Sequence, residues 1–406
     1  MGVVQLRNTT AWRAFRTRTL ERAYERRSAE YRKRLEARGV AYAEVDVVRD
    51  IRKNSRSVER RFGEIRTFLV TPDFSWHNVL ASSLKRLGPV TWYRFDGDRF
   101  WWRSRPGART WVPRRTEINA EIRFRARQAY EEEGVDWIFC YTEGVHLLRD
   151  TVRYFREELG LPTVMMCLDD KQSWELGRWG NQDIGQIDLA REVDLYWTSA
   201  RECCNWVLAE GGHPIFMPEG CDPYQFRPVE VGKTLDLCFI GAAYGFRRAF
   251  IDRVQKKLSK YGYTVACFGP GWRRGSSGVW GQDFIRTLNR AWINLGHGGI
   301  GYSENLMNVK TRDFEAPAVG TAAYLTTFNP DLAPSFDIGR EICCYHSDQD
   351  LIEQTVSLLS DKECLLDIAR RGRQRCLNDH TWVHRFVRIL ELLGVFTTCH
   401  EFSISN

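Results

Sequence analysis

The sequence of 406 residues has no run of about 18 or more apolar residues, so no segment is expected to span a membrane as a helix. Its first stretch, MGVVQLRNTTAWRAF, lacks the apolar core of roughly 7–15 residues that a secretory signal needs. No C-x-x-C spacing occurs among the twelve cysteines, which argues against a structural zinc site. Several cysteines stand inside apolar runs, where a reduced cysteine behaves as a small hydrophobic residue. These absences predict a cytoplasmic protein with free thiols.

The composition is that of a chain that folds around sizeable cores. With 43% hydrophobic and 13% aromatic residues, the sequence falls outside the intrinsically disordered class. Its length predicts two or three domains of about 100–200 residues each. The net charge of +7 is unevenly spread, because the first 61 residues hold 17 Lys and Arg against 8 Asp and Glu.

The Arg-rich N-terminal segment, residues 1–62, is predicted to be a basic and mostly helical extension. Leu, Tyr and Ala form a weak apolar stripe in WRAFRTRTLERAYERRSAEYRKRLEARG, with Arg at most other positions. Two interpretations remain open. The segment is either a solvated helix packed on the body, or a surface (residues 1–61) that contacts an anionic partner, membrane lipid or nucleic acid. The lipid alternative would place the protein peripherally on the inner face of the membrane.

The rest of the chain alternates short apolar strands with amphipathic helices, which indicates open parallel sheets. The predicted strands of the first series are 65–70, 89–95, 135–141, 161–168 and 194–199. Those of the second series are 234–241, 263–269, 291–296, 321–327 and 341–347. The turn-rich stretch MPEGCDPYQFRP (217–228) separates the two series. The predicted fold is therefore α/β with two doubly wound, Rossmann-like domains, 63–228 and 229–380, followed by a helix that crosses back and a tail at 381–406.

Ligands of open parallel sheets bind at the carboxyl ends of the strands. No G-x-G-x-x-G follows either opening strand, which argues against an ordinary dinucleotide dehydrogenase. The second domain instead carries the loops GAAYGFRR (241–248), GPGWRRG (269–275), GHGGIGYSEN (296–305) and NVKTRDFEAPAVG (308–320). Small residues let backbone amides approach a ligand, and basic side chains and helix N-termini favour an anion. The predicted ligand is a diphosphate, with Arg247, Arg248, Lys310 and Arg312 as the basic side chains. The other predicted ligand-binding residues are Gly241, Tyr244, Gly269 and His297, the last in a loop expected to hold a base.

Glu315 suits a different part of such a ligand. Its carboxylate has two acceptor oxygens and no donor, so it can accept both hydroxyls of a ribose. The small residues APAVG after it would let the following helix lie close to the ligand and the sheet. Each arginine alone is an ordinary surface charge. Their combination predicts an anionic ligand.

The segment from about 234 to 390 resembles the C-terminal half of GT-B glycosyltransferases, in particular the CgeB-like branch related to the retaining family 4. The matching stretches are LDLCFIGAAYGFR, VACFGPGW, INLGHGG, VKTRDFEAPAVG, FDIGREICCYHSDQDLIEQTVSLLSD and IARRGRQRCLNDHTWVHR, and MMCLDDKQSW and MPEGCDPYQFRP match more loosely. The resemblance implies a nucleotide-diphosphate sugar as donor, with a UDP-sugar expected, bound mainly by the second domain. It also implies an acceptor in the first domain, no bound metal or cofactor, and a reaction in a cleft between the two domains.

The sequence departs from the resembled family at one position. Retaining family-4 enzymes usually carry a Glu-x7-Glu pair, and Glu315 matches the second glutamate. Met307 stands where the first is expected, with Glu304 as a nearby substitute. Inversion and retention of the anomeric configuration therefore both stay open.

Candidates for catalysis follow predicted strands of the first domain. His77, in TPDFSWHN, has an imidazole suited to removing a proton from an acceptor hydroxyl. Asp169 and Asp170 follow VMMCL, where one would act as base or hold sugar hydroxyls, and close carboxylates shift one another's pKa. The alternatives are a capping or helix-surface histidine and a simple N-cap before a helix. Glu143, in YTEGVH, is a weaker candidate of the same kind.

The stretch FDGDR (95–99) contains Asp96 and Asp98 in the D-x-D pattern that holds a metal in the other major glycosyltransferase fold. Asp-Gly is also a standard turn signal, so WYRFDGDRFWW is interpreted as two strands joined by a tight turn. No metal site is therefore predicted. The aromatic-rich stretch 92–111 is expected to pack as a hairpin on the body, with a sugar chain or stacked bases as the alternative ligands.

Three functions compete at this point. The first is a metal-independent glycosyltransferase that acts on a hydroxyl of a glycan, protein or lipid. The second is a non-catalytic binding or assembly protein on the same fold, which the missing first glutamate favours. The third is a glycosyltransferase whose acceptor is nucleic acid, held by the Arg-rich segment. The sequence does not predict an oligomeric state.

Overall fold

A computed structural model of the protein describes residues 10–54, 60–96, 111–180, 182–272 and 278–395. The chain divides into two compact units. We call Arg27–Met217 with Trp382–Ser403 the N-terminal unit, and Met1–Arg26, Pro218–Thr381 and Ile404–Asn406 the C-terminal unit. The boundary between the units falls between Met217 and Pro218, whereas the sequence analysis placed it between residues 228 and 229.

The N-terminal unit is built on a sheet of six strands in the order β2-β1-β3-β4-β7-β8, and all neighbouring strands are parallel. The strands are β1 (Thr67–Pro72), β2 (Val90–Phe95), β3 (Trp137–Cys140), β4 (Thr163–Cys167), β7 (Leu195–Thr198) and β8 (Pro214–Phe216). Every residue of β1, β3, β4 and β7 is buried. A parallel strand that is covered on both faces is apolar along its whole length, which explains why these strands were visible as short apolar runs.

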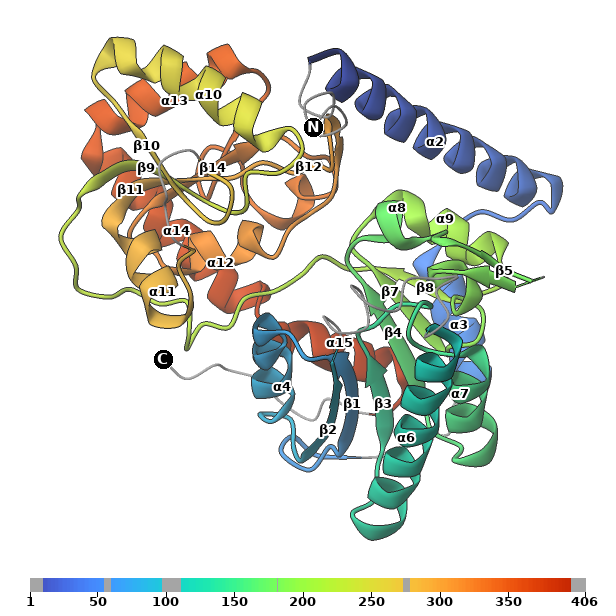
Figure 1. The fold of residues 1–406 in the computed structure, drawn as a ribbon. Coiled ribbons are helices and arrows are strands. Elements are labelled where there is room, and N and C mark those ends of the chain that lie inside the picture. Colours follow the sequence, from blue (N-terminus) through green and yellow to red (C-terminus); the bar gives the residue numbers. More distant parts are fainter. Residues whose placement is uncertain (1–9, 55–59, 97–110, 181, 273–277, 396–406) are drawn as a thin grey trace. The chain divides into compact units, whose positions relative to one another are not determined.

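Helices cover both faces of this sheet (Figure 1). One face carries α3 (Glu44–Asn54), α4 (Asn78–Leu84) and α15 (Trp382–Leu393), whose apolar side chains share one core cluster with Leu69, Phe139 and Trp197 of the strands. The other face carries α6 (Trp111–Glu132) and α7 (Arg149–Arg153). The remaining elements are η1 (Ser75–His77), η2 (Tyr154–Glu158), α8 (Asp170–Ser173), the hairpin β5 (Gly177–Trp179) and β6 (Gln182–Ile184), η3 (Gln186–Asp188) and α9 (Arg201–Ala209).

The C-terminal unit repeats this plan with five parallel strands in the order β10-β9-β11-β14-β15. They are β9 (Leu235–Ile240), β10 (Val265–Phe268), β11 (Ala291–Leu295), β14 (Ala323–Thr327) and β15 (Cys343–Tyr345). One face packs against α10 (Arg247–Leu258) and α13 (Asp348–Ser360), and the other against α11 (Gly281–Arg290), α12 (Arg312–Ala318) and α14 (Lys362–Asp379). A hairpin of β12 (Gly299–Ile300) and β13 (Ser303–Met307) follows β11, and η4 (Ser259–Tyr261) and η5 (Ala333–Ser335) are single 3-10 turns.

The predicted fold class is confirmed, since both units are Rossmann-like α/β layers on parallel sheets. All ten predicted strands are present. The sequence missed β8, which has three residues and begins with a proline, and it missed both short hairpins. The second strand of the predicted aromatic hairpin and Asp98 lie outside the described residues.

The long basic helix α2 (Thr10–Ala37) is divided between the units at Arg26/Arg27. Its second half is held in the N-terminal unit by Tyr31 and by arginines such as Arg34, which pairs with Glu210 at 2.7 Å. Tyr31 is buried, its hydroxyl accepts a hydrogen bond of 2.9 Å from Trp174 Nε1, and its ring stacks on Trp206 at 6.0 Å. None of the described helices is long and apolar enough to cross a bilayer.

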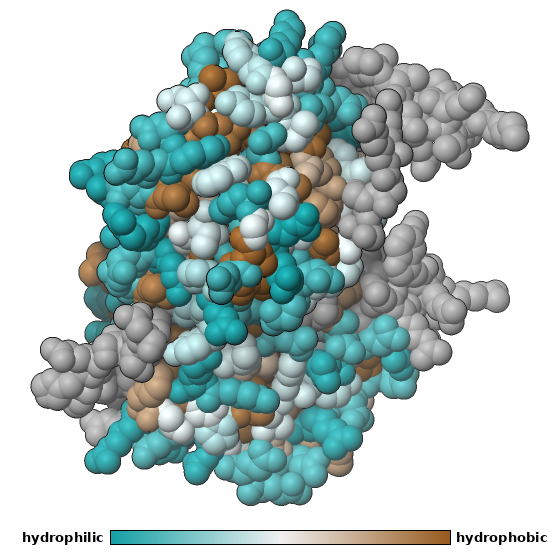
Figure 2. Space-filling view, turned by 90° about the vertical axis from the view of Figure 1, so that its left-hand side faces the viewer, coloured by the Kyte–Doolittle hydropathy of each residue, from teal (hydrophilic) through white to brown (hydrophobic). Residues whose placement is uncertain are grey.

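The described surface mixes polar and apolar residues, and most of the described cysteines are buried. On the face seen in Figure 2, hydrophobic residues are scattered among hydrophilic ones. The eleven cysteines within the described residues are free thiols, and Cys364 is the exposed one among them. Burial raises the pKa of the thiols of Cys343 and Cys344, to about 11 and about 12.

We expect Phe386→Ala to lower the free energy of unfolding of the N-terminal unit by about 3–5 kcal/mol, because it leaves a large cavity. The Phe386 ring is fully buried and lies 5.2 Å from Phe139 and 6.1 Å from Trp197. Urea denaturation followed by circular dichroism measures the change. The control is Val387→Ala, one residue along on a half-buried position, and an equal shift in both variants would contradict the packing described here.

Candidate functional site

The loops that follow β9 and β10 touch each other at the carboxyl edge of the second sheet. The amide of Gly241 donates to the carbonyl of Phe268 at 2.8 Å, and Ala243 N donates to Pro270 O at 2.9 Å. Gly269 has a φ of 137°, and a Cβ there would lie 2.5 Å from the carbonyl oxygen of Gly241. Both features require glycine. The predicted residues Gly241 and Gly269 therefore form one backbone surface without side chains.

Tyr244 and Arg247 flank this glycine surface at the start of α10. Tyr244 is half-exposed, and the Arg247 guanidinium lies 4.6 Å from the centre of its ring. Arg247 Nη1 donates a long hydrogen bond of 3.4 Å to the carbonyl of Ala242. The charge of Arg247 is thus held over the loop that follows β9. The adjacent Arg248 instead donates to the carbonyl of Gly271, in the loop after β10.

The segment Gly296–Gly301 has the G-x-G-x-x-G spacing, directly after β11. A dinucleotide fingerprint needs a helix after the glycines, whereas here the glycines lead into the hairpin β12–β13. The ring of His297 is buried between Phe246, at 4.5 Å, and Phe250, at 4.7 Å, and its Nδ1 accepts from Gly299 N at 2.9 Å. Burial, with help from Arg247 and Arg253, lowers the pKa of His297 to about 3. His297 is therefore a neutral ring that shapes its own loop.

One buried carboxylate, which the sequence did not single out, organises the start of α12. Asp313 accepts from the amide of Lys310 at 2.8 Å and from the Tyr324 hydroxyl at 2.5 Å. Burial raises the pKa of Asp313 to about 6, against the lowering effect of the Tyr324 hydrogen bond. Tyr324 belongs to the neighbouring strand β14, so Asp313 ties the Lys310 loop to the sheet. The spacing of Lys310 and Asp313, three residues apart at a helix start, was the available signal.

Glu315 and Arg312 face each other one turn apart in α12. Arg312 Nη1 lies 3.5 Å from Glu315 Oε2, and the guanidinium lies 4.1 Å from the centre of the Phe284 ring. The Glu315 side chain is 14% exposed. Burial raises the pKa of Glu315, and the Arg312 charge opposes that rise. The carboxylate thus keeps acceptor capacity beyond its single ion pair.

Glu304 and Glu315, the candidates for a Glu-x7-Glu pair, differ in their contacts. Glu304, on β13, forms an ion pair with Arg253 at 2.7 Å, and Arg253 also pairs with Asp348 at 2.9 Å. This network fixes the hairpin to α10 and α13. Met307 closes β13, where the first glutamate of the pair would stand. The structure therefore gives Glu304 a structural partner and leaves Glu315 with Arg312.

The first half of α2 packs on the hairpin β12–β13. Thr17 Oγ1 donates to the carbonyl of Tyr302 at 2.8 Å. Glu21 accepts from the hydroxyl of Ser303 and, at 3.4 Å, from the amide of Asn305. Arg18, Arg22 and Arg26 are exposed on the same half of the helix. This half of α2 thus packs on the body, and an anionic partner for its arginines stays a prediction.

The three predicted catalytic residues lie in the N-terminal unit and have different surroundings. Asp170 is buried, and its two oxygens accept from Tyr196 Oη at 2.6 Å and Thr198 Oγ1 at 2.5 Å. Burial raises its pKa to about 6. Asp169 precedes α8 and is exposed.

His77 is enclosed by aromatic rings. Its ring centre lies 4.3 Å from that of Trp76 and 5.0 Å from that of Tyr141, and Nδ1 is 2.7 Å from the carbonyl oxygen of Pro72. Since a carbonyl can only accept, Nδ1 carries the proton. Burial lowers the pKa of His77 to about 4. The imidazole is therefore neutral at neutral pH and has its Nε2 lone pair available.

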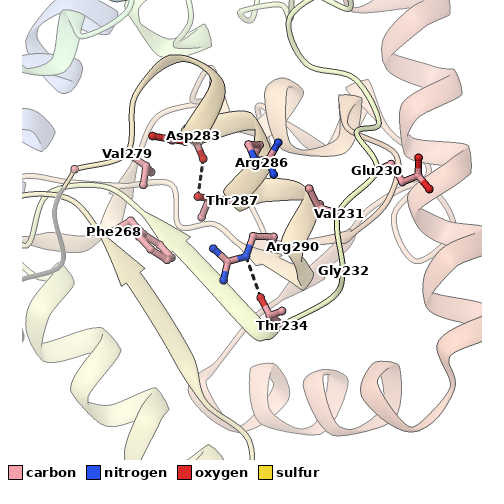
Figure 3. A pocket seen from close by; sticks show the side chains of 11 residues that line it. Glu230, Val231, Gly232, Thr234, Phe268, Val279, Asp283, Arg286, Thr287 and Arg290 are labelled. Carbon is pink, nitrogen blue, oxygen red and sulfur yellow. Dashed lines mark hydrogen bonds between the residues drawn. The ribbon is translucent and has the colours of Figure 1, made fainter.

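A cavity of about 470 Å³ opens beside α11 in the C-terminal unit (Figure 3). In its lining, Arg290 Nε donates a hydrogen bond of 3.0 Å to the hydroxyl of Thr234. The cavity is lined by Glu230, Val231, Gly232, Thr234, Phe268, Gly278, Val279, Asp283, Arg286, Thr287 and Arg290. None of the predicted ligand-binding residues lines it. Within the described part of the chain, no group of three or more His, Cys, Asp or Glu side chains is arranged to hold a metal ion.

Residues 247–391 match the sequence model of a family described as glycosyl transferase-like. No curated protein matches the chain. Among solved structures, HepE of Anabaena in complex with UDP and glucose has a TM-score of 0.52 at 10% identity, over 82% of this chain and 100% of that one. A glycosyltransferase of Rickettsia africae has 0.52 at 8% identity, over 82% and 99%. Sucrose-phosphate synthase of Thermosynechococcus elongatus has 0.50 at 8% identity, over 81% and 98%. These similarities establish the GT-B fold.

We expect Tyr324→Phe to lower the free energy of unfolding by about 1.5–3 kcal/mol at pH 8, because a hydrogen bond to a charged group is lost. The loss should be smaller near pH 4. The Tyr324 bond lowers the folded-state pKa of Asp313, so its removal raises that pKa further above the unfolded value of about 3.9, and the resulting loss of stability appears as pH rises. Tyr261→Phe, at an exposed position, is the control. Equal losses at both pH values would contradict a charged partner.

Proposed function

We propose that the protein is a glycosyltransferase that moves a sugar from a nucleotide-diphosphate donor, a UDP-sugar, to an acceptor hydroxyl. The observation that carries the proposal is the carboxyl edge of the second sheet. There, a glycine surface, basic side chains and a buried glutamate with spare acceptor oxygens come from one unit. The family match over 247–391 spans the basic residues and Glu315. The UDP and glucose bound to HepE are the chemistry that this edge would accommodate.

In this proposal, each part of the donor has its own partners. Glu315 accepts the ribose hydroxyls, and Arg312, paired with Glu315, fixes the orientation of the carboxylate and adds positive charge. Arg247 and Lys310 balance the charge of the diphosphate, which approaches the backbone at Gly241 and Gly269. The neutral His297 shapes the loop beside the base. Protein cations then carry the charge of the leaving diphosphate without a divalent metal.

The N-terminal unit would bind the acceptor, which we propose to be a hydroxyl of a glycan, a protein or a lipid. Its sheet has the same kind of carboxyl edge, where His77 and Asp169 follow β1 and β4. The hydrogen bonds of Asp170 support a positioning role for it. Both of its oxygens accept hydrogen bonds from β7, so it holds the loop after β4 in place and leaves Asp169 exposed beside it.

We expect UDP to raise the melting temperature of the wild type and to leave that of Glu315→Gln unchanged, in a thermal-shift comparison of UDP, GDP, dTDP, CDP and ADP. At 100 times Kd, a ligand bound only to the folded state adds about 2.7 kcal/mol of stability. Gln keeps the size of the side chain and removes its charge. Glu353→Gln, on an exposed position of α13, is the matched control and should behave as wild type. No shift with any nucleotide at millimolar concentration would favour a non-catalytic protein on this fold.

A further inference from the structure

Three loops of the N-terminal unit bring ionisable or aromatic side chains to one edge of its sheet. They follow β1, β3 and β4, which are adjacent parallel strands with Val70 opposite Cys140, and Cys140 opposite Met165. The loop after β3 carries Tyr141, whose ring meets those of Trp76, at 4.9 Å, and His77. Two residues later it carries Glu143.

The carboxyl of Glu143 differs from other acids of this unit because its buried Oε2 has no hydrogen-bond partner within the described residues. Asp136 instead pairs with Arg60, at 2.8 Å, and Glu192 pairs with Arg153, at 2.8 Å. A buried acceptor without a partner costs roughly 1–3 kcal/mol, so such a carboxyl oxygen at a sheet edge indicates a site for something that binds there.

The backbone holds this carboxyl in place. The carbonyl of Glu143 accepts from the amides of His146, at 2.8 Å, and Leu147, at 3.0 Å. The next residue, Gly144, packs so closely on the backbone of Gly185 that a Cβ would not fit. The carboxyl group is therefore carried on a fixed turn, and an incoming hydroxyl would meet it in one position.

The surroundings also set the protonation of Glu143 near neutral pH. Burial and the negative charge of Asp169 raise its pKa to about 7. The thiol of Cys167, at the end of β4, also interacts with Glu143, and burial keeps this thiol protonated because its pKa lies well above the usual value. His77 is the weaker base of this edge, since its pKa is lowered to about 4. A group with a pKa near the working pH is the more effective proton acceptor.

We propose that Glu143 is the catalytic base of the transfer reaction and touches the acceptor hydroxyl. The Glu143 carboxylate takes the proton of that hydroxyl as its oxygen forms a bond to the anomeric carbon of the donor sugar. The bond from that carbon to the diphosphate oxygen breaks, and the nucleoside diphosphate leaves with the electron pair. A single displacement of this kind inverts the anomeric configuration. The assignment rests on the proposed function of the C-terminal unit.

The test compares the wild type with Glu143→Gln in two measurements. The first is the release of UDP from UDP-glucose with water as the acceptor, since the same base would take a proton from water. We expect the rate to fall by about 100- to 10,000-fold in Glu143→Gln, the usual contribution of a general base. The second is the thermal shift with UDP, which we expect to be the same in both proteins.

Two further variants separate catalysis from structure. Glu157→Gln, at an exposed position of the same unit, should release UDP at the wild-type rate. Asp169→Asn removes a negative charge that raises the pKa of Glu143. The rise of the UDP-release rate with pH, centred near pH 7 in the wild type, should therefore move to lower pH in Asp169→Asn. A purely structural Glu143 would leave this profile where it is.

The outcomes distinguish the two proposals. UDP release at the wild-type rate in Glu143→Gln, or a pH profile that Asp169→Asn does not move, would overturn the assignment of Glu143 alone. A wild type that shows neither a thermal shift with UDP nor UDP release would overturn the proposed function, and the base with it. An infrared titration, which needs no turnover, measures the protonation of the Glu143 carboxyl directly. The difference spectrum of wild type and Glu143→Gln should show a carboxyl that ionises near pH 7, and a carboxyl still protonated at about pH 9 would overturn the proposal, because it could not accept a proton.

Discussion

All strands within each of the two main sheets run in the same direction, and the rest of the molecule depends on that constraint. Parallel strands need helical crossovers, so each strand ends at the same edge and each loop at that edge starts from a buried, fixed point. In the C-terminal unit, this brings Gly241, Gly269 and Gly296 together although they are 28 and 27 residues apart. In the N-terminal unit, it brings His77, Glu143 and Asp169 to one edge. Functional side chains from distant parts of the chain therefore meet at one sheet edge without long loops.

At these edges, the buried carboxylates fall into two groups. Asp170 and Asp313 each accept two hydrogen bonds from the fold, including one from a tyrosine on a neighbouring strand, and they position loops. Within the described residues, Glu143 Oε2 has no hydrogen-bond partner, and Glu315 has an ion pair with Arg312, after which a carboxylate can still accept further hydrogen bonds. An acid that is buried without all of its partners destabilises a protein, so this second group is the candidate for binding and proton transfer. Whether a buried carboxylate positions a loop or is a candidate for binding thus depends on the hydrogen-bond donors around it.

The sequence was sufficient for the parallel sheets because Thr163–Cys167 and Leu195–Thr198 are buried on both faces and stand out as apolar runs. It could not show β8, which has three residues, or the hairpin within GHGGIGYSEN, whose polar and glycine-rich composition indicates only a loop. The sequence ranked Asp170 above Glu143 as a catalytic candidate. Both residues follow a strand, so nothing local distinguishes their roles. The difference lies in Tyr196 and Thr198, which reach Asp170 from another strand. The hydrogen bond from Tyr324 to Asp313 could not be predicted from the sequence for the same reason. Hydrogen-bond partners set by tertiary packing carry no local signature.

The way the chain is shared between the units bears on how it is made. The core of the N-terminal unit contains Trp382 and Phe386, so its sheet lacks one covering helix until α15 has been synthesised. The start of α2 waits in the same way, since Thr17 and Glu21 find their partners 285 and 282 residues later. Contacts over such separations form late, and the surfaces they cover stay exposed to other chains in the meantime. The N-terminal unit is thus completed only after the strands of the C-terminal unit have been synthesised, and α15 completes its helical cover.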